Sequence, residues 1–213
     1  PGGPDGTIVA LNKKTGATVW RTKDITATPH YSSIISVKID GVPQYVQLTV
    51  QSVVGVAPQD GHLLWRAARR GSTAVIPTPI YHANHVYVTS GYGAGCNLFK
   101  ISSEDGKFKA EEVYANKDMS NQHGGVVRVD EFLYGFTDQG RTWMCQEFQT
   151  GKVVWKNVGV AKGAIGYADG HLYLRSESGK GTIAKPPVPT KKNPENLKRR
   201  AEWFQRRTSK LSG

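Results

Sequence analysis

Residues 10–20 read ALNKKTGATVW, in which Gly16 precedes Trp20 by four residues. The same arrangement returns in VAPQDGHLLW, which ends at Trp65, and in EFQTGKVVW, which ends at Trp155. The glycines of this pattern recur every 45 residues, at Gly16, Gly61, Gly106 and Gly151. A period of this size is typical of repeat architectures, in which each unit is one supersecondary piece that buries its apolar face against the next.

Each repeat is predicted to form four short strands. In residues 77–114, apolar runs separated by turn residues indicate strands at 79–81, 85–88, 97–101 and 107–114. A tyrosine marks the second strand of successive units, at Tyr45, Tyr87, Tyr134 and Tyr173. The 24 glycines of the 213-residue chain also suit many short strands better than a helical bundle. We therefore predict an all-β chain built from four-stranded antiparallel meanders.

The glycine and the tryptophan have separate predicted roles. A glycine can adopt the left-handed conformation that a bulged turn between the third and fourth strands requires. The indole four residues later offers a large flat apolar face that can be buried between adjacent sheets. The third unit departs from this pattern, because Ala110 stands where its tryptophan is expected, with Val113 nearby. The predicted blade-docking residues are Gly16, Trp20, Gly61, Trp65, Gly106, Gly151 and Trp155.

A radial stack of four-stranded sheets is a β-propeller. The repeats cover residues 1–184, beginning at the third strand of one unit and ending after a short third strand of another. This predicts a partial β-propeller with three whole blades plus terminal half-blades. Because GTIA at 181–184 echoes GTIVA at 6–10, two arrangements stay open. We favour an open array over one in which the two ends share a blade.

Residues 185–213 form a separate basic tail. They hold nine Lys and Arg against two Glu, so most of the net charge of +11 lies here. A proline-punctuated linker leads to NPENLKRRAEWFQRRTSKL, in which an apolar face predicts a short basic amphipathic helix. Such a helix could bind anionic lipid or nucleic acid. The alternative, which we favour, is a solvated end without either partner.

Composition excludes two classes of protein. The sequence has no run of about 18 apolar residues, so no transmembrane helix is expected. Cys96 and Cys145 are too few and too widely spaced for a disulfide framework or a zinc site, and we expect both to be buried free thiols. The N-terminal residues show no export signal, so the compartment stays unknown from the residues alone.

With A-x-N-x-x-T-G-x-x-x-W at Ala10–Trp20 and its two variants, residues 6–184 resemble the pyrroloquinoline-quinone (PQQ)-like repeat β-propeller family. That family includes quinoprotein dehydrogenases and BamB-type outer-membrane assembly scaffolds. Its members usually close with more blades than this sequence encodes, so the resemblance implies a portion of a larger propeller. It also implies a periplasmic or other extracytoplasmic location. The tryptophan motif is common to both kinds of member and therefore does not decide between them.

The residues themselves favour the scaffold. The resemblance allows PQQ and Ca²⁺ as cofactors, but a quinoprotein dehydrogenase needs a basic carboxylate, several oxygen ligands for calcium and a flat pocket. We cannot assemble that set, and the vicinal cysteine pair of those enzymes is absent. We therefore predict no catalytic residue, metal or cofactor, and a non-catalytic protein-interaction scaffold with a protein partner. The alternative is a PQQ-dependent alcohol or sugar dehydrogenase or a fragment of one.

One local motif is a candidate binding site. NQHGG at 121–125 leads into the first strand of its unit, and two glycines there allow close approach of a backbone or ligand. We name Asn121, Gln122 and His123 as candidate ligand or partner contacts. The alternative is that these side chains only make local hydrogen bonds.

Overall fold

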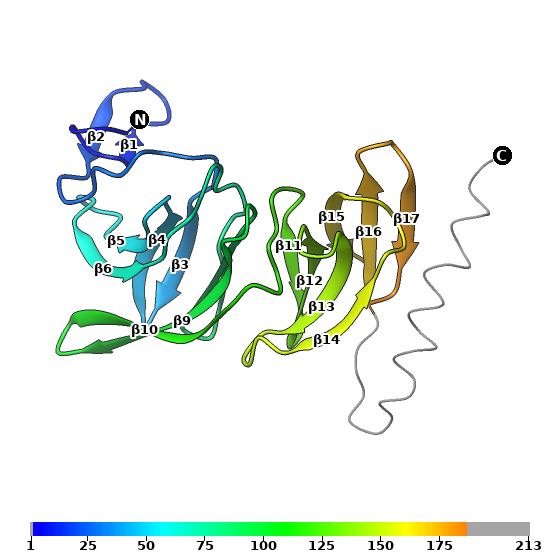
Figure 1. Ribbon diagram of the computed structural model, residues 1–213. Helices are drawn as coiled ribbons and strands as arrows, with labels where there is room; N and C mark the ends of the chain where they lie inside the picture. Colours follow the sequence, from blue (N-terminus) through cyan, green and yellow to red (C-terminus); the bar gives the residue numbers. More distant parts are fainter. Residues whose placement is uncertain (1, 187–213) are drawn as a thin grey trace.

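The computed structural model describes residues 2–186, which form five antiparallel sheets that succeed one another along the chain (Figure 1). The first sheet pairs β1 (Val9–Leu11) with β2 (Thr18–Arg21). The second contains β3 (Ile35–Ile39), β4 (Val42–Leu48), β5 (Ser52–Val56) and β6 (Leu63–Ala68). The third contains β7 (Ile80–His82), β8 (His85–Ser90), β9 (Gly95–Glu104) and β10 (Lys107–Asn116). The fourth contains β11 (Val126–Val129), β12 (Phe132–Thr137), β13 (Thr142–Glu147) and β14 (Val153–Asn157). The fifth contains β15 (Gly163–Ala168), β16 (His171–Ser176) and β17 (Gly181–Ala184).

Every sheet is a meander in which consecutive strands are hydrogen-bonded neighbours. The predicted partial β-propeller, with three whole blades between incomplete ones, is confirmed. Within the described residues β1 pairs only with β2 and β17 only with β16, so the array is open and its ends do not share a blade. The predicted C-terminal helix lies outside the described residues, and the division at 184/185 stays a prediction. None of the described residues forms a helix that could cross a membrane.

Three of the four repeated glycines lie in the same type of turn. Gly16, Gly61 and Gly151 have φ of 75°, 76° and 69°, in the left-handed region that glycine adopts without strain. Each of their N–H groups donates to the carbonyl four residues earlier, at 2.8, 2.9 and 3.0 Å respectively. The same hydrogen-bonded turn therefore joins β1 to β2, β5 to β6 and β13 to β14.

Trp20 connects the first sheet to the turn of the second. Its Nε1 donates to the Pro58 carbonyl at 2.9 Å, and its ring lies 6.5 Å from the Tyr45 ring. The ring also covers Gly61 so closely that a Cβ built there would lie 2.4 Å from an indole carbon. The absence of a side chain on Gly61 is thus what allows the indole to reach the backbone.

Tyr114 makes the corresponding contact between the third and fourth sheets. Its hydroxyl donates to the Phe148 carbonyl at 3.0 Å, and a Cβ at Gly151 would lie 2.7 Å from its ring. Phe148 precedes Gly151 by three residues, as Pro58 precedes Gly61. The contact to the next turn is therefore made by Tyr114 and not from the position of the absent tryptophan, Ala110, because the hairpin of this sheet is longer.

The third sheet has this longer hairpin because its turn is different. Asp105 and Gly106, with φ of 50° and 75°, form a two-residue connection between strands of ten residues each. This is the tight turn that joins twisted strands, in place of the bulged turn predicted at Gly106. Nothing lies within 4 Å of a Cβ built on Gly106, so no aromatic ring packs against this glycine.

Trp65 is buried between the second and third sheets without a partner glycine in the next turn. It is 3% exposed, and its Nε1 donates to Gln44 Oε1 at 2.7 Å. Phe108 and Ala110 of the long β9–β10 hairpin pack against the same core cluster. The extended hairpin thus covers this junction from the outside.

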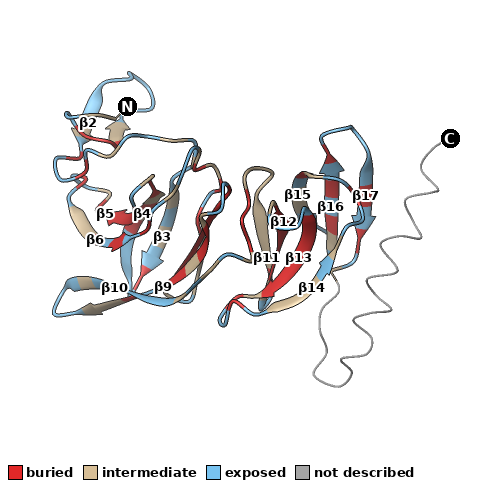
Figure 2. Ribbon diagram, in the orientation of Figure 1, coloured by how far each residue is buried: buried red, intermediate tan, exposed pale blue. Residues whose placement is uncertain are grey.

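Trp155 lies between the fourth and fifth sheets. It packs in two clusters that include Phe136, Trp143 and Leu174 on one side and Leu172 on the other. Figure 2 shows how burial follows this stacking, since the middle strands β5 and β13 are buried almost throughout whereas β2 is largely exposed. The apolar interior of the array is the set of junctions between sheets.

Both cysteines are buried free thiols, as predicted. Burial raises the pKa of the Cys145 thiol to about 12, and burial also raises the pKa of the Cys96 thiol. The thiolate is the reactive form of cysteine. Both groups are therefore protonated and chemically inert in the folded chain at neutral pH.

Replacing the turn glycines by alanine should separate backbone strain from the ring contact. Gly16→Ala, with nothing within 4 Å of the new Cβ, should lower the free energy of unfolding by about 1 kcal/mol through its positive φ alone. Gly61→Ala and Gly151→Ala should cost about 1–3 kcal/mol more, because the methyl group displaces the ring that covers it. Chemical denaturation measures all three, and equal losses at Gly16 and Gly61 would contradict the assigned contact.

Burial of the two thiols should also make them unreactive in the native protein. Ellman's reagent at about pH 8 should modify neither cysteine of the native protein, since both pKa values are raised above that of a free thiol. In denaturant the reagent should titrate both of the two thiols per chain. Rapid modification of the native protein without loss of secondary structure would show that a thiol is accessible.

Candidate functional site

The NQHGG motif lies in the connection between β10 and β11, at the end of the sheets where several turns gather. In an antiparallel meander, the chain enters the first strand at the same end at which the second strand turns into the third. The β10–β11 connection therefore lies beside the β8–β9 turn, the β12–β13 turn and the β14–β15 connection. The hydrogen bonds below join these four segments.

Asn121 is buried and hydrogen-bonded to two neighbouring strands. It is 1% exposed, its Nδ2 donates to the Phe136 carbonyl at 2.8 Å, and its backbone N–H donates to Thr89 Oγ1 at 3.3 Å. Its Oδ1 is also buried and accepts no hydrogen bond within the described part of the chain. Asn121 thus holds the connection against β8 and β12 and presents no atom to the surface.

Gln122 lies at the centre of a polar cluster. Its Nε2 donates to the Tyr92 hydroxyl at 2.6 Å, and its Oε1 accepts from Lys162 Nζ. Lys162 Nζ also donates to Asp138 Oδ1 at 2.9 Å, and these two side chains are 15% and 31% exposed. Four connecting segments thereby meet through four side chains. We call Tyr92, Gln122, Asp138 and Lys162 the loop cluster.

The loop cluster is packed tightly where it meets the β8–β9 turn. A Cβ on Gly91 would lie 2.7 Å from Gln122 Cα and 3.1 Å from Asp138 Oδ2. The neighbouring Tyr92 has a φ of 58°, which is uncommon for a bulky residue, and its side chain is 47% exposed. The strained turn therefore presents an aromatic ring at the surface beside the cluster.

His123 extends this surface towards the fifth sheet. Its Nε2 lies 2.7 Å from Glu177 Oε1 in the β16–β17 turn, and the two side chains are 36% and 61% exposed. A pair this open to solvent contributes little to stability, about 0–1 kcal/mol. Both side chains are accessible to a partner.

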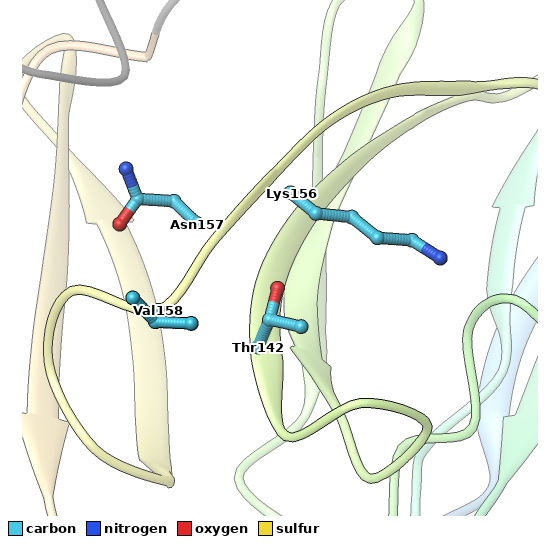
Figure 3. Close-up of a pocket in the computed structure, with 4 residues that line it drawn as sticks. All are labelled: Thr142, Lys156, Asn157 and Val158. Carbon is cyan, nitrogen blue, oxygen red and sulfur yellow. The ribbon is translucent and has the colours of Figure 1, made fainter.

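A shallow hollow of about 280 Å³ lies between β13, β14 and the segment that leads to the fifth sheet (Figure 3). Thr142, Lys156, Asn157 and Val158 line it. The Lys156 side chain points away from Asn157 and ends 3.3 Å from Asp118 Oδ1. Val158 is 68% exposed, so the hollow has an apolar rim on the same side of the molecule as the connecting segments.

The sequence located part of this surface. It named Asn121, Gln122 and His123, and the structure places Gln122 and His123 in contacts between loops while Asn121 is internal. It missed Tyr92, Lys162 and Glu177, because they lie 30, 40 and 54 residues from their partners and belong to different turns. It also did not name Asp138, because a single aspartate close to a glycine is typical of an ordinary turn.

The described residues contain no cluster of possible metal-ligating side chains. Among residues 2–186, no three His, Cys, Asp or Glu side chains lie close enough together to hold a metal ion. A calcium site takes six to eight oxygen ligands from carboxylates, carbonyl groups and water. We therefore derive no chemical step from a calcium-bound quinone.

A comparison with known protein families identifies the family of the repeats. A family model described as "Outer membrane protein assembly factor BamB" matches residues 3–157, more than half of the chain. The chain belongs to this PQQ-like repeat family. The resemblance inferred from the Gly–Trp spacing is thus confirmed, and the match ends where the fourth sheet ends.

Solved structures share the fold at low sequence identity. BamB from Moraxella catarrhalis matches with a TM-score of 0.64 and 14% identity, over 87% of this chain and 54% of that one. The computationally designed Ika8 protein matches with a TM-score of 0.61 and 12% identity, over 85% and 53%. The designed Ika4 protein matches with a TM-score of 0.57 and 13% identity, over 80% and 99%. The PQQ-like repeat chain thus spans about half the length of the first two.

A search of curated proteins gave no match. At the identities found among solved structures, similarity establishes the β-propeller fold and leaves activity and partners undetermined.

We expect the ion pair in the loop cluster to contribute to the free energy of unfolding. Lys162→Met should lower the free energy of unfolding by about 1–2 kcal/mol, because it leaves the half-buried Asp138 carboxylate without its cation. Lys156→Met is the matched control, since its pair with Asp118 is 40% and 41% exposed and should contribute under about 1 kcal/mol. Urea denaturation at fixed salt measures both, and equal effects would show that the cluster adds nothing beyond a surface ion pair.

Proposed function

We propose that the chain is a non-catalytic protein-interaction scaffold of the PQQ-like repeat family. Its partner is a protein, and the surface formed by the loop cluster with His123 and Glu177 is where we place the contact. By the same reasoning we propose an extracytoplasmic location, because the matching family model is described as an outer membrane assembly factor.

The observation that carries this proposal is the contrast between rigid support and accessible groups at one end of the sheets. Gln122 and Lys162 are fixed by hydrogen bonds between segments, while Tyr92 and His123 beside them remain exposed. Aromatic side chains next to fixed polar groups are favoured at protein interfaces. Loops held by a rigid β-scaffold are also the usual place for binding residues.

The quinoprotein alternative can be tested directly. A ligand that binds only the native state must raise the melting temperature by mass action. If the chain does not bind the cofactor, PQQ with Ca²⁺ in excess should therefore leave the melting temperature of the purified chain unchanged. A rise that grows with PQQ concentration and disappears with EDTA would contradict the non-catalytic proposal.

A binding test follows from the exposed pair. A photo-crosslinking amino acid at position 123 should form an adduct with a partner protein in the source cells. The same amino acid at Lys14, in the turn of the first sheet, is the control. His123→Ala should then reduce the affinity measured with the identified partner, while the melting temperature changes little because the lost contact between His123 and Glu177 is exposed. A matching loss of binding and stability, or adducts only from position 14, would contradict the assigned surface.

A further inference from the structure

The connecting segments of the third, fourth and fifth sheets lie at two opposite ends of the strands. In an antiparallel meander, the segments that enter a first strand lie at the same end as the turns between second and third strands, and the remaining turns lie at the other end. We call the first set, which includes the loop cluster, the loop end: residues 69–79, 91–94, 117–125, 138–141, 158–162 and 177–180. The second set is the hairpin end: residues 83–84, 105–106, 130–131, 148–152 and 169–170.

The loop end is basic and the hairpin end is acidic. The loop end holds three Asp and Glu against six Lys and Arg, which are Arg69, Arg70, Lys117, Arg141, Lys162 and Lys180. The hairpin end holds Lys152 against four acids, which are Asp105, Asp130, Glu131 and Asp169. Six-residue strands such as β8, β12 and β13 separate the two ends by about 20 Å. Charges are screened over about 8 Å at physiological salt, so a partner that meets one end responds mainly to the charges of that end.

The acidic side chains of the loop end all have partners, whereas several of its cations do not. The three pairs, at 3.3, 2.9 and 2.7 Å, are Asp118 with Lys156, Asp138 with Lys162 and Glu177 with His123. Within the described part of the chain, Lys117, Arg141 and Lys180 form no ion pair, and all three are exposed. The loop end therefore presents uncompensated positive charge to the solvent.

A buried cation lies next to the same surface. Arg69 is 4% exposed, and its guanidinium donates to Ser90 Oγ at 2.7 Å and to the Gly95 carbonyl at 2.9 Å, on either side of the turn that carries Tyr92. Its Nε donates to Asn97 Oδ1 at 3.3 Å, so all three acceptors are uncharged. Burial lowers the pKa of Arg69 to about 10, which leaves it charged at neutral pH. Because salt screens a buried charge less than an exposed one, Arg69 adds to the positive field at this turn.

We propose that the partner contacts the loop end through an acidic segment of protein, rich in Asp and Glu. This inference rests on the proposed function, which places a protein partner at the loop cluster, and adds the chemistry of the segment that binds there. Complementary charge across an interface speeds the encounter and selects the partner. The exposed cations can each bind a carboxylate, and the guanidinium of Arg141 can do so through two parallel hydrogen bonds.

The pattern of charge favours an acidic protein over a nucleic acid or an anionic membrane. Three carboxylates lie among the cations of the loop end. A nucleic acid strand carries a phosphate about every 3.4 Å and would place negative charge against those carboxylates. A protein segment can instead place its own carboxylates opposite the cations and uncharged groups opposite Asp138 and Glu177. The exposed ring of Tyr92 adds an apolar contact of the kind that is enriched at protein interfaces.

A defined probe tests the charge preference. A fluorescein-labelled peptide in which Glu and Asp alternate with Ser should bind the purified chain in a fluorescence anisotropy titration. The same peptide with Lys in place of each acid should bind much more weakly. Because salt screens exposed charges, raising its concentration from about 50 to about 300 mM should weaken binding of the acidic peptide several-fold.

Charge reversal separates a local contact from the net charge of the chain. A double variant with Arg141→Glu and Lys180→Glu should raise the dissociation constant of the acidic peptide about tenfold or more, because two attractions become repulsions. The matched control combines Lys14→Glu and Lys152→Glu, in the β1–β2 and β13–β14 turns, and should change it less than about threefold. All four side chains are exposed, so circular dichroism and the melting temperature should stay close to those of the parent.

Three results overturn the proposal. They are equal weakening by both double variants, an acidic peptide that binds no more tightly than the basic one, and tighter binding of a DNA oligonucleotide or of anionic vesicles through Arg141 and Lys180. The proposed function is judged separately. A partner cross-linked from position 123 whose affinity is unchanged by the Arg141→Glu, Lys180→Glu variant keeps the scaffold and refutes the acidic segment. Adducts only from position 14 remove the contact surface and both conclusions with it.

Discussion

The fold depends on aromatic rings buried at the junctions between sheets, and at two of the four junctions the ring covers a turn glycine of the next sheet. At Gly61 and Gly151 the absence of a Cβ lets Trp20 and Tyr114 approach the turn closely enough to bond to a backbone carbonyl. One residue thus supplies apolar burial and a directional hydrogen bond. Because each sheet is apolar on both sides, such contacts must be repeated for the array to be stable, as in other repeat proteins.

The loop surface is a consequence of that stacking. Once the sheets are held at a fixed spacing, their connecting segments are brought side by side, and Gln122, Lys162 and Asp138 meet although no two of them are adjacent in sequence. The stacking also explains why the two ends differ from the middle. Each internal sheet is covered twice, whereas Val19 and Tyr173 lie on faces that the described chain does not cover.

Most of the architecture could be predicted from the sequence, because it follows from local rules. Glycine spacing fixes the turns, alternation of apolar residues fixes the strands, and the order of units fixes how many sheets are complete. The third unit shows where this fails. A two-residue turn at Asp105 and Gly106 lengthens the hairpin, and the ring moves from the expected Ala110 to Tyr114 while the 45-residue period is kept. Spacing alone cannot show a change of turn type.

The sequence by itself determined the repeat, the all-β class and the family, since each follows from a local motif that recurs along the chain. The tertiary structure alone decided which side chains form the candidate surface. It buried Asn121, joined Gln122 to Lys162 and paired His123 with Glu177. These contacts span 40 residues or more in two of the three cases, and only the stacking angle and register of whole sheets determine which loops meet.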